Sequence, residues 1–438
     1  MRTNGIITEF ISAKTKEGST QQTVLQDQRA ARTPTNKKDF TKIRAHINSY
    51  NPQISHYTRQ NAPFRRYLDS SLTIKAMSDD FNSNGRVCSY QLYAQVFREE
   101  NIGFSRPRQD DCDLCQNYKR HNELDNHDSE QCELCKKATL HLKKAEEART
   151  EYRKDKEEED PTASTFAADM QKVILLPKMT LKEHFFVSRL VVFNETFASV
   201  YGEVDLLILW HEAIAGRNAN HVSSAFIKVI KSCNTEKVVF LVDNCPAQNK
   251  NWTLYTAMAW SVNQEWGPQV IKFKYLEPGH TFMRADSVHG AIGTKMKEAE
   301  TIDTYDDFID LCGKAGKRNR PIPMAANDFF QVKDGHPQRR TGDIPLLSEV
   351  CEVKFTKGCH TLEYKSRFDQ ESYTECKFLR RRFKLDTTAT RIEGARGMQK
   401  KKKAGIVKLI SSLPPEKQKF WLELPENGTV GDLVHQHE

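Results

Sequence analysis

The sequence lacks any apolar run long enough to cross a membrane, which takes about 20 residues. The longest candidate, residues 206–210, has the length of a strand. The first residues, Met1-Arg2-Thr3-Asn4, also lack the apolar stretch of a signal peptide, so we expect neither a secreted nor a membrane protein. Without a secretion signal, the 11 cysteines indicate metal ligands and free thiols rather than disulfides.

Apolar residues are also sparse for one large compact body. They make up 38% of the 438 residues, whereas 28% are charged. At roughly 100–200 residues per domain, a chain of this length is expected to form about two to four folded regions.

The net charge of +8 is concentrated near the C-terminus. Residues 377–408 hold twelve basic and two acidic side chains, including the clusters at 380–382 and 400–403. Such density suits a polyanion, because each neutralised phosphate releases condensed counterions. A solvated charged face is the alternative for either cluster alone, and lysine runs of this length also serve as nuclear import signals. We therefore expect DNA as a partner and the nucleus as the location.

Two C-x2-C pairs separated by sixteen residues form the strongest local motif, namely Cys112, Cys115, Cys132 and Cys135. Each C-x2-C turn directs two thiolates at one ion, and the intervening loop lets the pairs converge. This spacing predicts one tetrahedral zinc site. Four protein ligands leave no open position, so the zinc would be structural. His127 or His141 could replace one cysteine, and the alternative is four unrelated buried thiols.

Beyond Pro161 the apolar pattern predicts the element order βββαβαβα. Strands are expected at 166–176, 184–200, 204–213, 237–242 and 269–275, and helices at 219–233, 250–264 and 282–300. Three strands joined by short turns would form an antiparallel meander, and the later strands would return as parallel strands through right-handed crossovers. This order fits the ribonuclease H-like fold, an α/β fold.

The predicted organisation has four regions. They are a mainly helical N-terminal region at 1–110, a four-cysteine zinc knuckle with a charged helix at 111–160, the ribonuclease H-like core at 161–313 and a basic C-terminal region at 314–438.

Three acidic residues on this core are candidate catalytic ligands. Asp243 directly follows an apolar strand, where ligands bind at the mouth of an α/β sheet, and Asp169 is an acid inside an apolar strand. Neighbouring first and fourth strands would bring the two together, and Asp286 could complete the set. Carboxylates suit Mg²⁺ or Mn²⁺, which support in-line displacement at a phosphodiester. The alternatives are that Asp243 and Asp286 cap helices and that Asp169 satisfies a core polar group.

Two histidines lie close to these acids in the sequence. His280 and His289 could assist near the site, and the alternative is that both are surface or core residues.

Residues 243–251, Asp-Asn-Cys-Pro-Ala-Gln-Asn-Lys-Asn, resemble the signature D-N-C-x-G-Q-N-K-N of a family of animal proteins derived from DNA transposons. Further likeness covers nearly the whole chain, including segments 44–50, 112–115, 169–178, 212–217, 279–289 and 403–421. The resemblance implies a DDE/D-type transposase ancestry, with Asp169, Asp243 and Asp286 as the transferable acids. Ala247 departs from the signature's glycine. Gly293 stands where an acidic residue is expected, so a third ligand at that position would have been lost.

The leading functional expectation is a transposon-derived nuclear protein. As an enzyme it would be a Mg²⁺- or Mn²⁺-dependent nuclease or transposase that cleaves or transfers DNA strands, with a structural zinc ion and with self-association as an option. The first alternative is a catalytically decayed protein that binds nucleic acid or other proteins and keeps the fold and the zinc site. The second alternative is a structural zinc protein with protein partners only.

Overall fold

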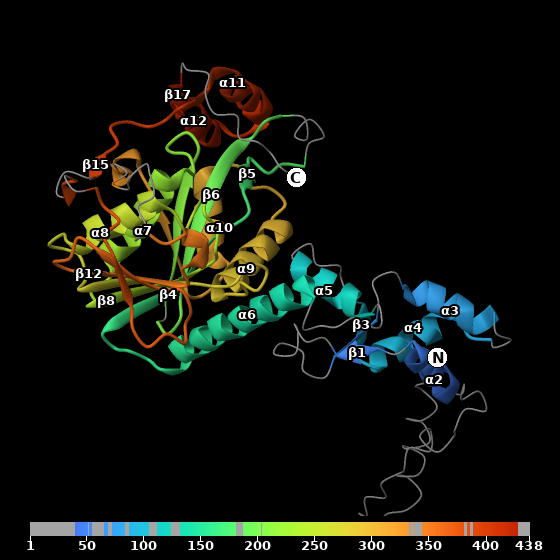
Figure 1. Ribbon diagram of the computed structural model, residues 1–438. Helices are drawn as coiled ribbons and strands as arrows, with labels where there is room; N and C mark the ends of the chain where they lie inside the picture. The colour runs from blue at the N-terminus through green and yellow to red at the C-terminus, as the bar shows by residue number, and fades with distance from the viewer. Residues whose placement is uncertain are drawn as a thin grey trace, which may run out of the picture. The chain divides into compact units, whose positions relative to one another are not determined.

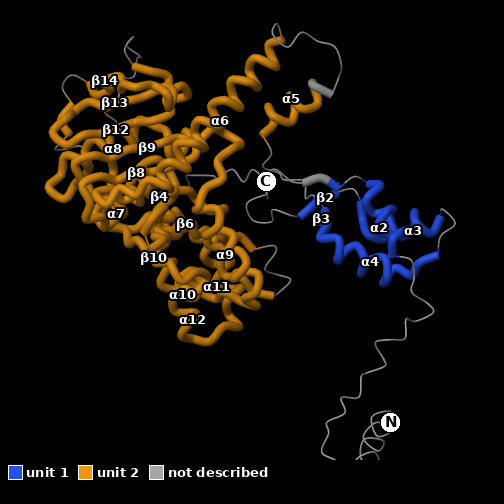
Figure 2. The backbone as a smooth tube through the Cα atoms, turned by 90° about the horizontal axis from the view of Figure 1, so that it is seen from below, with its two compact units in different colours: residues 1–109 blue, residues 110–438 orange. Residues whose placement is uncertain are grey.

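The computed structural model describes residues 40–50, 52–54, 65–68, 72–83, 87–104, 112–123, 132–180, 187–202, 204–332, 335, 344–380, 383–385 and 389–427. The chain divides into two compact units, residues 1–109 and 110–438, which are coloured separately in Figure 2. Each unit has an apolar core of its own. In the part of the chain that is described, no helix is both long and apolar enough to span a bilayer.

The first unit packs helices and a small sheet around one core. Its elements are α2 (Phe40–Ser49), β1 (Gln53–Ile54), β2 (Arg66–Leu68), α3 (Ile74–Ser83), α4 (Tyr90–Glu99) and β3 (Ile102–Phe104), with strand order β1-β2-β3. His46 is buried between the helices. Its Nδ1 lies 2.8 Å from the hydroxyl of Tyr93 and its Nε2 lies 3.0 Å from Oδ2 of Asp80. These contacts join α2 to α3 and α4.

The second unit is built on a mixed ten-stranded sheet (Figure 1). The strand order is β10-β7-β6-β4-β8-β9-β12-β13-β14, and β5 pairs with β6. The bounds are β4 Ala163–Met170, β5 Ile174–Leu176, β6 Leu190–Ser199, β7 Asp205–His211, β8 Lys237–Val242, β9 Val270–Tyr275, β10 Asn319–Pro323, β12 Glu352–Thr356, β13 Leu362–Lys365 and β14 Thr374–Cys376. Strand β6 is antiparallel to β4 and β7, whereas β4, β8 and β9 are mutually parallel. The predicted α/β class is confirmed.

The predicted sequence of elements is present, with shifted bounds. Helices α7 (Ala219–Ser232), α8 (Trp252–Val262) and α9 (Arg284–Glu298) connect or follow the parallel strands. The strand expected at 166–176 is two strands, β4 and β5, because polar Gln171 and Lys172 interrupt it. The strand expected from residue 184 is described only from Leu190, and residues 181–186 lie outside the described part.

Alternating side chains bury both faces of the sheet. On β7, Leu206, Ile208 and Trp210 belong to the core under α7 and α8, whereas Leu207 and Leu209 belong to the core under α9 and α10 (Tyr305–Lys314). Helices α11 (Lys400–Leu409) and α12 (Pro415–Glu423) add Ile406 and Trp421 to the second core, and Ile410, directly after α11, also belongs to it. Figure 1 shows α7 and α8 on one side of the sheet and α9 and α10 on the other.

Residues beyond 313 extend the same sheet. Strand β10 pairs with β7 at one edge, and β12 pairs with β9 toward the other. Two short pairs lie outside this sheet, β11 (Phe330–Val332) with β15 (Ala389–Arg391), and β16 (Met398–Gln399) with β17 (Glu426–Asn427).

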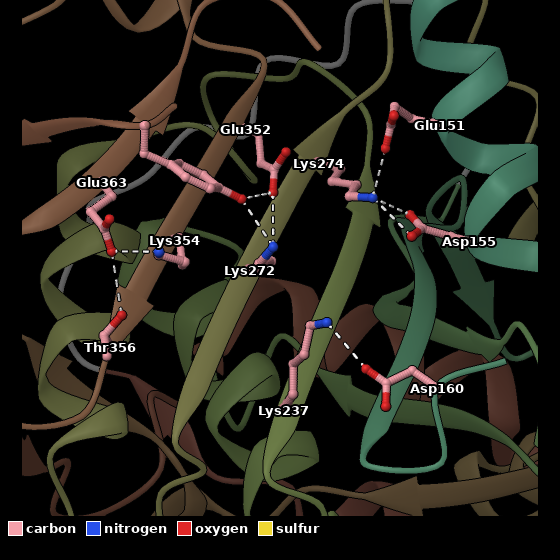
Figure 3. A network of polar contacts seen from close by, with 11 residues as sticks. Glu151, Asp155, Asp160, Lys237, Lys272, Lys274, Glu352, Lys354, Thr356 and Glu363 are labelled. Atoms are coloured by element: carbon pink, nitrogen blue, oxygen red, sulfur yellow. Dashed lines mark hydrogen bonds and ion pairs between the residues drawn. The ribbon is translucent and has the colours of Figure 1, made fainter. Parts of the chain in front are cut away.

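Charged side chains join helix α6 (Glu133–Glu157) to strand β9 of the sheet (Figure 3). Lys274 of β9 is 9% exposed, and its Nζ lies 2.7 Å from Oδ2 of Asp155 and 3.0 Å from Oε2 of Glu151. Lys272 pairs with Glu352 at 3.4 Å, and Lys237 pairs with Asp160 at 3.2 Å. These lysines line a polar cleft of about 610 Å³, but each is already paired with an acid, so the cleft offers little net positive charge to an anion.

Candidate metal centres

The sheet register places Asp169 on β4 and Asp243 directly after the neighbouring strand β8. Strands β4 and β8 are parallel, and Ala168 lies opposite Val242. Asp169 and Asp243 each come one residue later, so both lie at the carboxyl end of the central strand pair. An acid at this edge faces the region where α/β sheets bind ligands.

The loop after β8 fixes the Asp243 carboxylate. Its Oδ1 accepts hydrogen bonds from Nδ2 of Asn249 and from the backbone N–H of Cys245. The cap of α8 is Asn251, whose Oδ1 accepts from the backbone N–H of Leu254 at 2.9 Å. Asp243 is therefore not the N-cap of α8.

Lys250 holds the same loop from inside. It is buried, and its Nζ donates to Oδ1 of Asn244 and to the backbone carbonyl of Val350, both at 2.6 Å. The ammonium also lies 4.6 Å from the ring centre of Tyr275, and burial lowers the pKa of Lys250 to about 8. The segment that carries the D-N-C-x-G-Q-N-K-N likeness thus forms one hydrogen-bonded loop. Ala247 is exposed within it.

Helix α9 brings Asp286 and His289 to Asp169. One ligand atom from each of the three lies within 4.8 Å of the others, so the group could hold a metal ion, but the predicted ligand Asp243 is not part of it. Nδ1 of His289 lies 3.7 Å from Oδ2 of Asp169. Asp286 is exposed, and its Oδ2 accepts from the backbone N–H of Met283 at 2.8 Å. It thus stabilises the start of α9, as the capping interpretation expects, and also lies within ligand reach of Asp169.

Burial and mutual repulsion favour the neutral forms of these groups when no cation is bound. Burial raises the pKa of Asp169 to about 7, with further repulsion from Asp243 and Asp286. Burial also raises the pKa of Asp243, although its hydrogen bonds from Asn249 and Cys245 act in the opposite direction. Burial lowers the pKa of His289 to about 4. A divalent cation would reverse this balance by stabilising the carboxylates.

Glu195 on β6 was missed in the sequence. Its side chain is fully buried, and among the described residues neither carboxylate oxygen has a hydrogen-bond partner. Burial, with repulsion from Asp169 and Asp243, raises its pKa well above the usual range. The signal was present, because Phe193-Asn194-Glu195-Thr196-Phe197 places an acid inside an apolar strand, as Asp169 does.

The four predicted zinc-binding cysteines do not form one group. Cys112 and Cys115 lie with His141 and His280, whereas Cys132 and Cys135 lie with His121. In each group the ligand atoms lie within 4.8 Å of one another, so both could hold a metal ion. This corrects the predicted four-thiolate arrangement. The reason is that each pair lies at the first turn of its own helix, α5 (Asp113–Glu123) or α6.

The structure places the two candidate histidines, His280 and His289, in different groups. His280 completes the group with Cys112 and Cys115, and His289 lies beside Asp169. His141, which the sequence offered as a substitute ligand, lies with Cys112. His127, the other substitute, lies outside the described residues.

Part of the basic C-terminal cluster supports the fold. Lys402 pairs with Glu212, and Lys403 donates to the backbone carbonyl of Leu424 at 2.7 Å. Lys400 and Lys401 are exposed, whereas Arg381 and Arg382 lie outside the described residues. Only part of the predicted positive charge is therefore seen at a surface.

Comparisons with known proteins give no identification of this chain. Searches of protein-family models, of curated proteins and of solved structures found no match. The function proposed below therefore depends on the side chains described above and on the resemblance in the sequence.

Proposed function

We propose that this chain is a transposon-derived protein with a ribonuclease H-like core that acts on DNA phosphodiesters with Mg²⁺ or Mn²⁺. The strand order β7-β6-β4-β8-β9, with only β6 antiparallel among these five, supports this fold assignment. The observation that carries the functional proposal is the group of Asp169, Asp286 and His289 at one edge of that sheet, with Asp243 directly after the neighbouring strand β8.

The acids fit a hard divalent cation. Asp169 and Asp243 are partly buried, the charge of Asp243 raises the pKa of Asp169, and both acids offer oxygen ligands, which Mg²⁺ and Mn²⁺ prefer. When bound, the ion would polarise a phosphodiester and lower the pKa of a coordinated water. Asp169 and Asp243 would hold it from neighbouring strands, Asp286 would supply the third carboxylate, and the Asn249 hydrogen bond would keep Asp243 in place.

The test is Mn²⁺-dependent nicking of supercoiled DNA by the purified chain and its Asp243→Asn variant. Asparagine has an NH2 group in place of one carboxylate oxygen, so the side-chain shape is kept but the negative charge of the ligand is lost. Activity should therefore fall at least about 100-fold, which corresponds to about 2.7 kcal/mol in the activation free energy. Exposed Asp306→Asn on α10 is the matched control and should keep full activity. Equal nicking by the parent and Asp243→Asn would overturn the catalytic assignment.

A second candidate is a catalytically decayed protein that still binds nucleic acid. The observation in its favour is Gly293, which lies one turn after His289 on α9 and brings no acid. A Cβ added at Gly293 meets no atom within 4 Å, so a side chain can begin there without steric conflict at its first carbon. Cleavage restored by Gly293→Glu, with none in the parent, would support decay, whereas cleavage by the parent would exclude it.

DNA is the partner that we propose, in the nucleus, with self-association as an option. Exposed Lys400, Lys401 and Lys408 on α11 and Arg380 supply positive charge for phosphates. Affinity for duplex DNA should then fall as salt rises, with a slope that becomes shallower in a Lys400→Gln/Lys401→Gln variant. Absent or salt-insensitive binding would instead favour a zinc protein with protein partners only.

We propose zinc for the two groups of thiolates and imidazoles. Sulfur and nitrogen ligands favour Zn²⁺ over Mg²⁺ or Mn²⁺, which prefer oxygen. The first group has four protein ligands, so its ion would be structural rather than catalytic.

A further inference from the structure

The two helices that carry the cysteines repeat one motif. Each has the pattern C-[D/E]-L-C followed by five residues and a histidine, and the two copies are offset by 20 positions. The first copy is Cys112, Cys115 and His121, and the second is Cys132, Cys135 and His141. The repeat places a histidine about two turns beyond a thiolate pair on each helix.

The copies exchange their histidines. Sγ of Cys112, at the start of α5, lies 3.1 Å from Nε2 of His141 on α6. Sγ of Cys132, at the start of α6, lies 3.2 Å from Nε2 of His121 in the last turn of α5. The start of each helix therefore lies beside a later turn of the other, which makes the pair antiparallel.

We propose that the α5–α6 pair binds two zinc ions, each held by the cysteines of one helix and the histidine of the other. The first ion is completed by His280, whose Nε2 lies 3.2 Å from Sγ of Cys115, 165 residues away in the chain. The second ion has three protein ligands among the described residues, namely Cys132, Cys135 and His121. This inference is independent of the phosphodiester chemistry proposed above.

The distances fit tetrahedral zinc. With Zn–S near 2.3 Å and Zn–N near 2.0 Å, sulfur and nitrogen ligands lie about 3.5 Å apart. The three S···N distances of 3.1, 3.2 and 3.2 Å are close to this value. A small outward relaxation of the side chains would admit each ion.

Neighbouring residues orient the ligands of the first group and let its loop approach closely. Nδ1 of His141 lies 2.8 Å from Oε1 of Glu277, which leaves Nε2 to face the metal. A carboxylate behind a ligating histidine orients the ring and raises its basicity. Gly279 has a φ of +76°, and a Cβ there would lie 2.6 Å from Cβ of Cys112, so only glycine lets the loop approach the thiolates.

The first ion would join the helix pair to the segment that leads into α9. The same segment is held by α6 at two further points, where Arg149 donates to the carbonyl of Phe282 at 2.6 Å and the hydroxyl of Tyr152 accepts from the N–H of Arg284 at 3.1 Å. Zinc at this group therefore supports the position of α9.

Metal content of the full chain tests the proposal. The protein purified with zinc should hold two zinc ions per chain by elemental analysis. His280→Asn and His121→Asn should each lose one ion, because each removes a ligand from one group only. Exposed His360→Asn, outside both groups, is the matched control and should keep both. A single four-thiolate site predicts one ion that neither histidine variant removes, and that result would overturn the proposal.

A cobalt measurement needs no variant and covers the case in which a histidine variant fails to fold. In the chain loaded with Co²⁺, the thiolate-to-cobalt absorption per ion should match a reference peptide with two cysteines and two histidines. Intensity equal to that of a four-cysteine reference peptide, with one cobalt per chain, would contradict two separate groups.

Discussion

At the scale of single residues, Asp169 links protonation to metal binding. Its pKa of about 7 arises from burial and from the Asp243 and Asp286 charges. The carboxyl is therefore mostly protonated at pH 6 and mostly ionised at pH 8. Because a cation binds the ionised form, protons compete with Mn²⁺ below pH 7.

We therefore expect the apparent affinity for Mn²⁺ to rise about tenfold per pH unit up to pH 7 and to level off above it. Electron paramagnetic resonance of free Mn²⁺ between pH 5.5 and 8.5 measures this. Asp169→Asn should bind weakly, with little pH dependence over this range. An affinity of the parent that is equal at pH 5.5 and 7.5 would contradict the assignment.

Glu195 gives a separate pH effect on stability. Its pKa is raised well above the usual range in the folded chain, so the folded state keeps a proton that the unfolded state releases above pH 4.5. The free energy of unfolding therefore falls as pH rises past 4.5, by up to about 1.4 kcal/mol per unit until the folded pKa is reached.

Glu195→Gln should remove this fall, because the amide has the same shape and no charge. Urea unfolding without divalent cations at pH 5, 6 and 7 should show a smaller decline for the variant than for the parent. Exposed Glu236→Gln is the control and should leave the decline unchanged. Parallel curves for the parent and Glu195→Gln would show that Glu195 is ionised in the folded protein.

The sequence predicts which acids lie near the sheet edge better than it predicts which side chains contact them. Asp169 and Asp243 are predictable because an acid within or directly after an apolar strand is unusual. His289 is not, because its contact with Asp169 depends on how α9 packs across β4 and β6. Glu195 could have been found by the argument used for Asp169.

At the scale of elements, α6 shows a helix held to a sheet by charge. Burial lowers the pKa of Lys274, but attraction to Asp155 and Glu151 outweighs it and leaves the pKa raised. The ammonium thus remains charged between α6 and β9. The helix also makes apolar contact, through Ala148 and Tyr152 against Ala167, Leu276 and Met283.

Lys274→Met should destabilise the protein by about 1–3 kcal/mol, because it leaves two partly buried carboxylates without their cation. Chemical denaturation measures the change. Lys295→Met is the control, since Lys295 pairs with Glu298 at 2.7 Å with both side chains about half exposed, and should cost less than about 0.5 kcal/mol. A loss no greater for Lys274→Met than for the control would contradict a structural role for this ion pair.

Element types were predictable where periodicity was strong. The strand at 237–242 and the helices at 219–233 and 250–264 follow from apolar spacing, and the structure places them within two residues of those bounds. The charged stretch before Pro161 predicts the long helix α6 but does not predict that α6 packs against the sheet. Its few apolar residues predict an exposed helix, whereas ion pairs hold it on the sheet.

At the scale of the whole molecule, Gly279 connects the helix pair to the sheet. Its positive φ and its close approach to Cys112 act together. Gly358 provides the matched comparison, because its φ of +84° is similar but a Cβ there meets no atom within 4 Å.

Gly358→Ala should therefore cost only the backbone strain of about 1–2 kcal/mol and keep both zinc ions. Gly279→Ala should cost more and lose the first ion, because the new Cβ displaces Cys112. Unfolding curves and zinc content measure both effects. Equal stability and equal zinc content in the two variants would show that the close approach does not matter.

Contacts between residues far apart in the sequence were the least predictable feature. The spacing of the C-x2-C pairs favoured one shared ion, although the histidines repeat at the same interval as the cysteines. Nothing in local spacing could have joined His280 to Cys115, because that contact depends on the sheet delivering the loop after β9 to the start of α5.

The packing of α6 has a practical consequence for designing shorter fragments of this protein. The polar run at 157–161 resembles a linker and suggests a fragment that begins there, with the sheet as a separate unit. Such a fragment would uncover Ala167, Leu276 and Met283 and leave Lys274 without its two carboxylates. Exposed apolar surface beside an unpaired lysine favours aggregation. An expression boundary should therefore lie before Cys112.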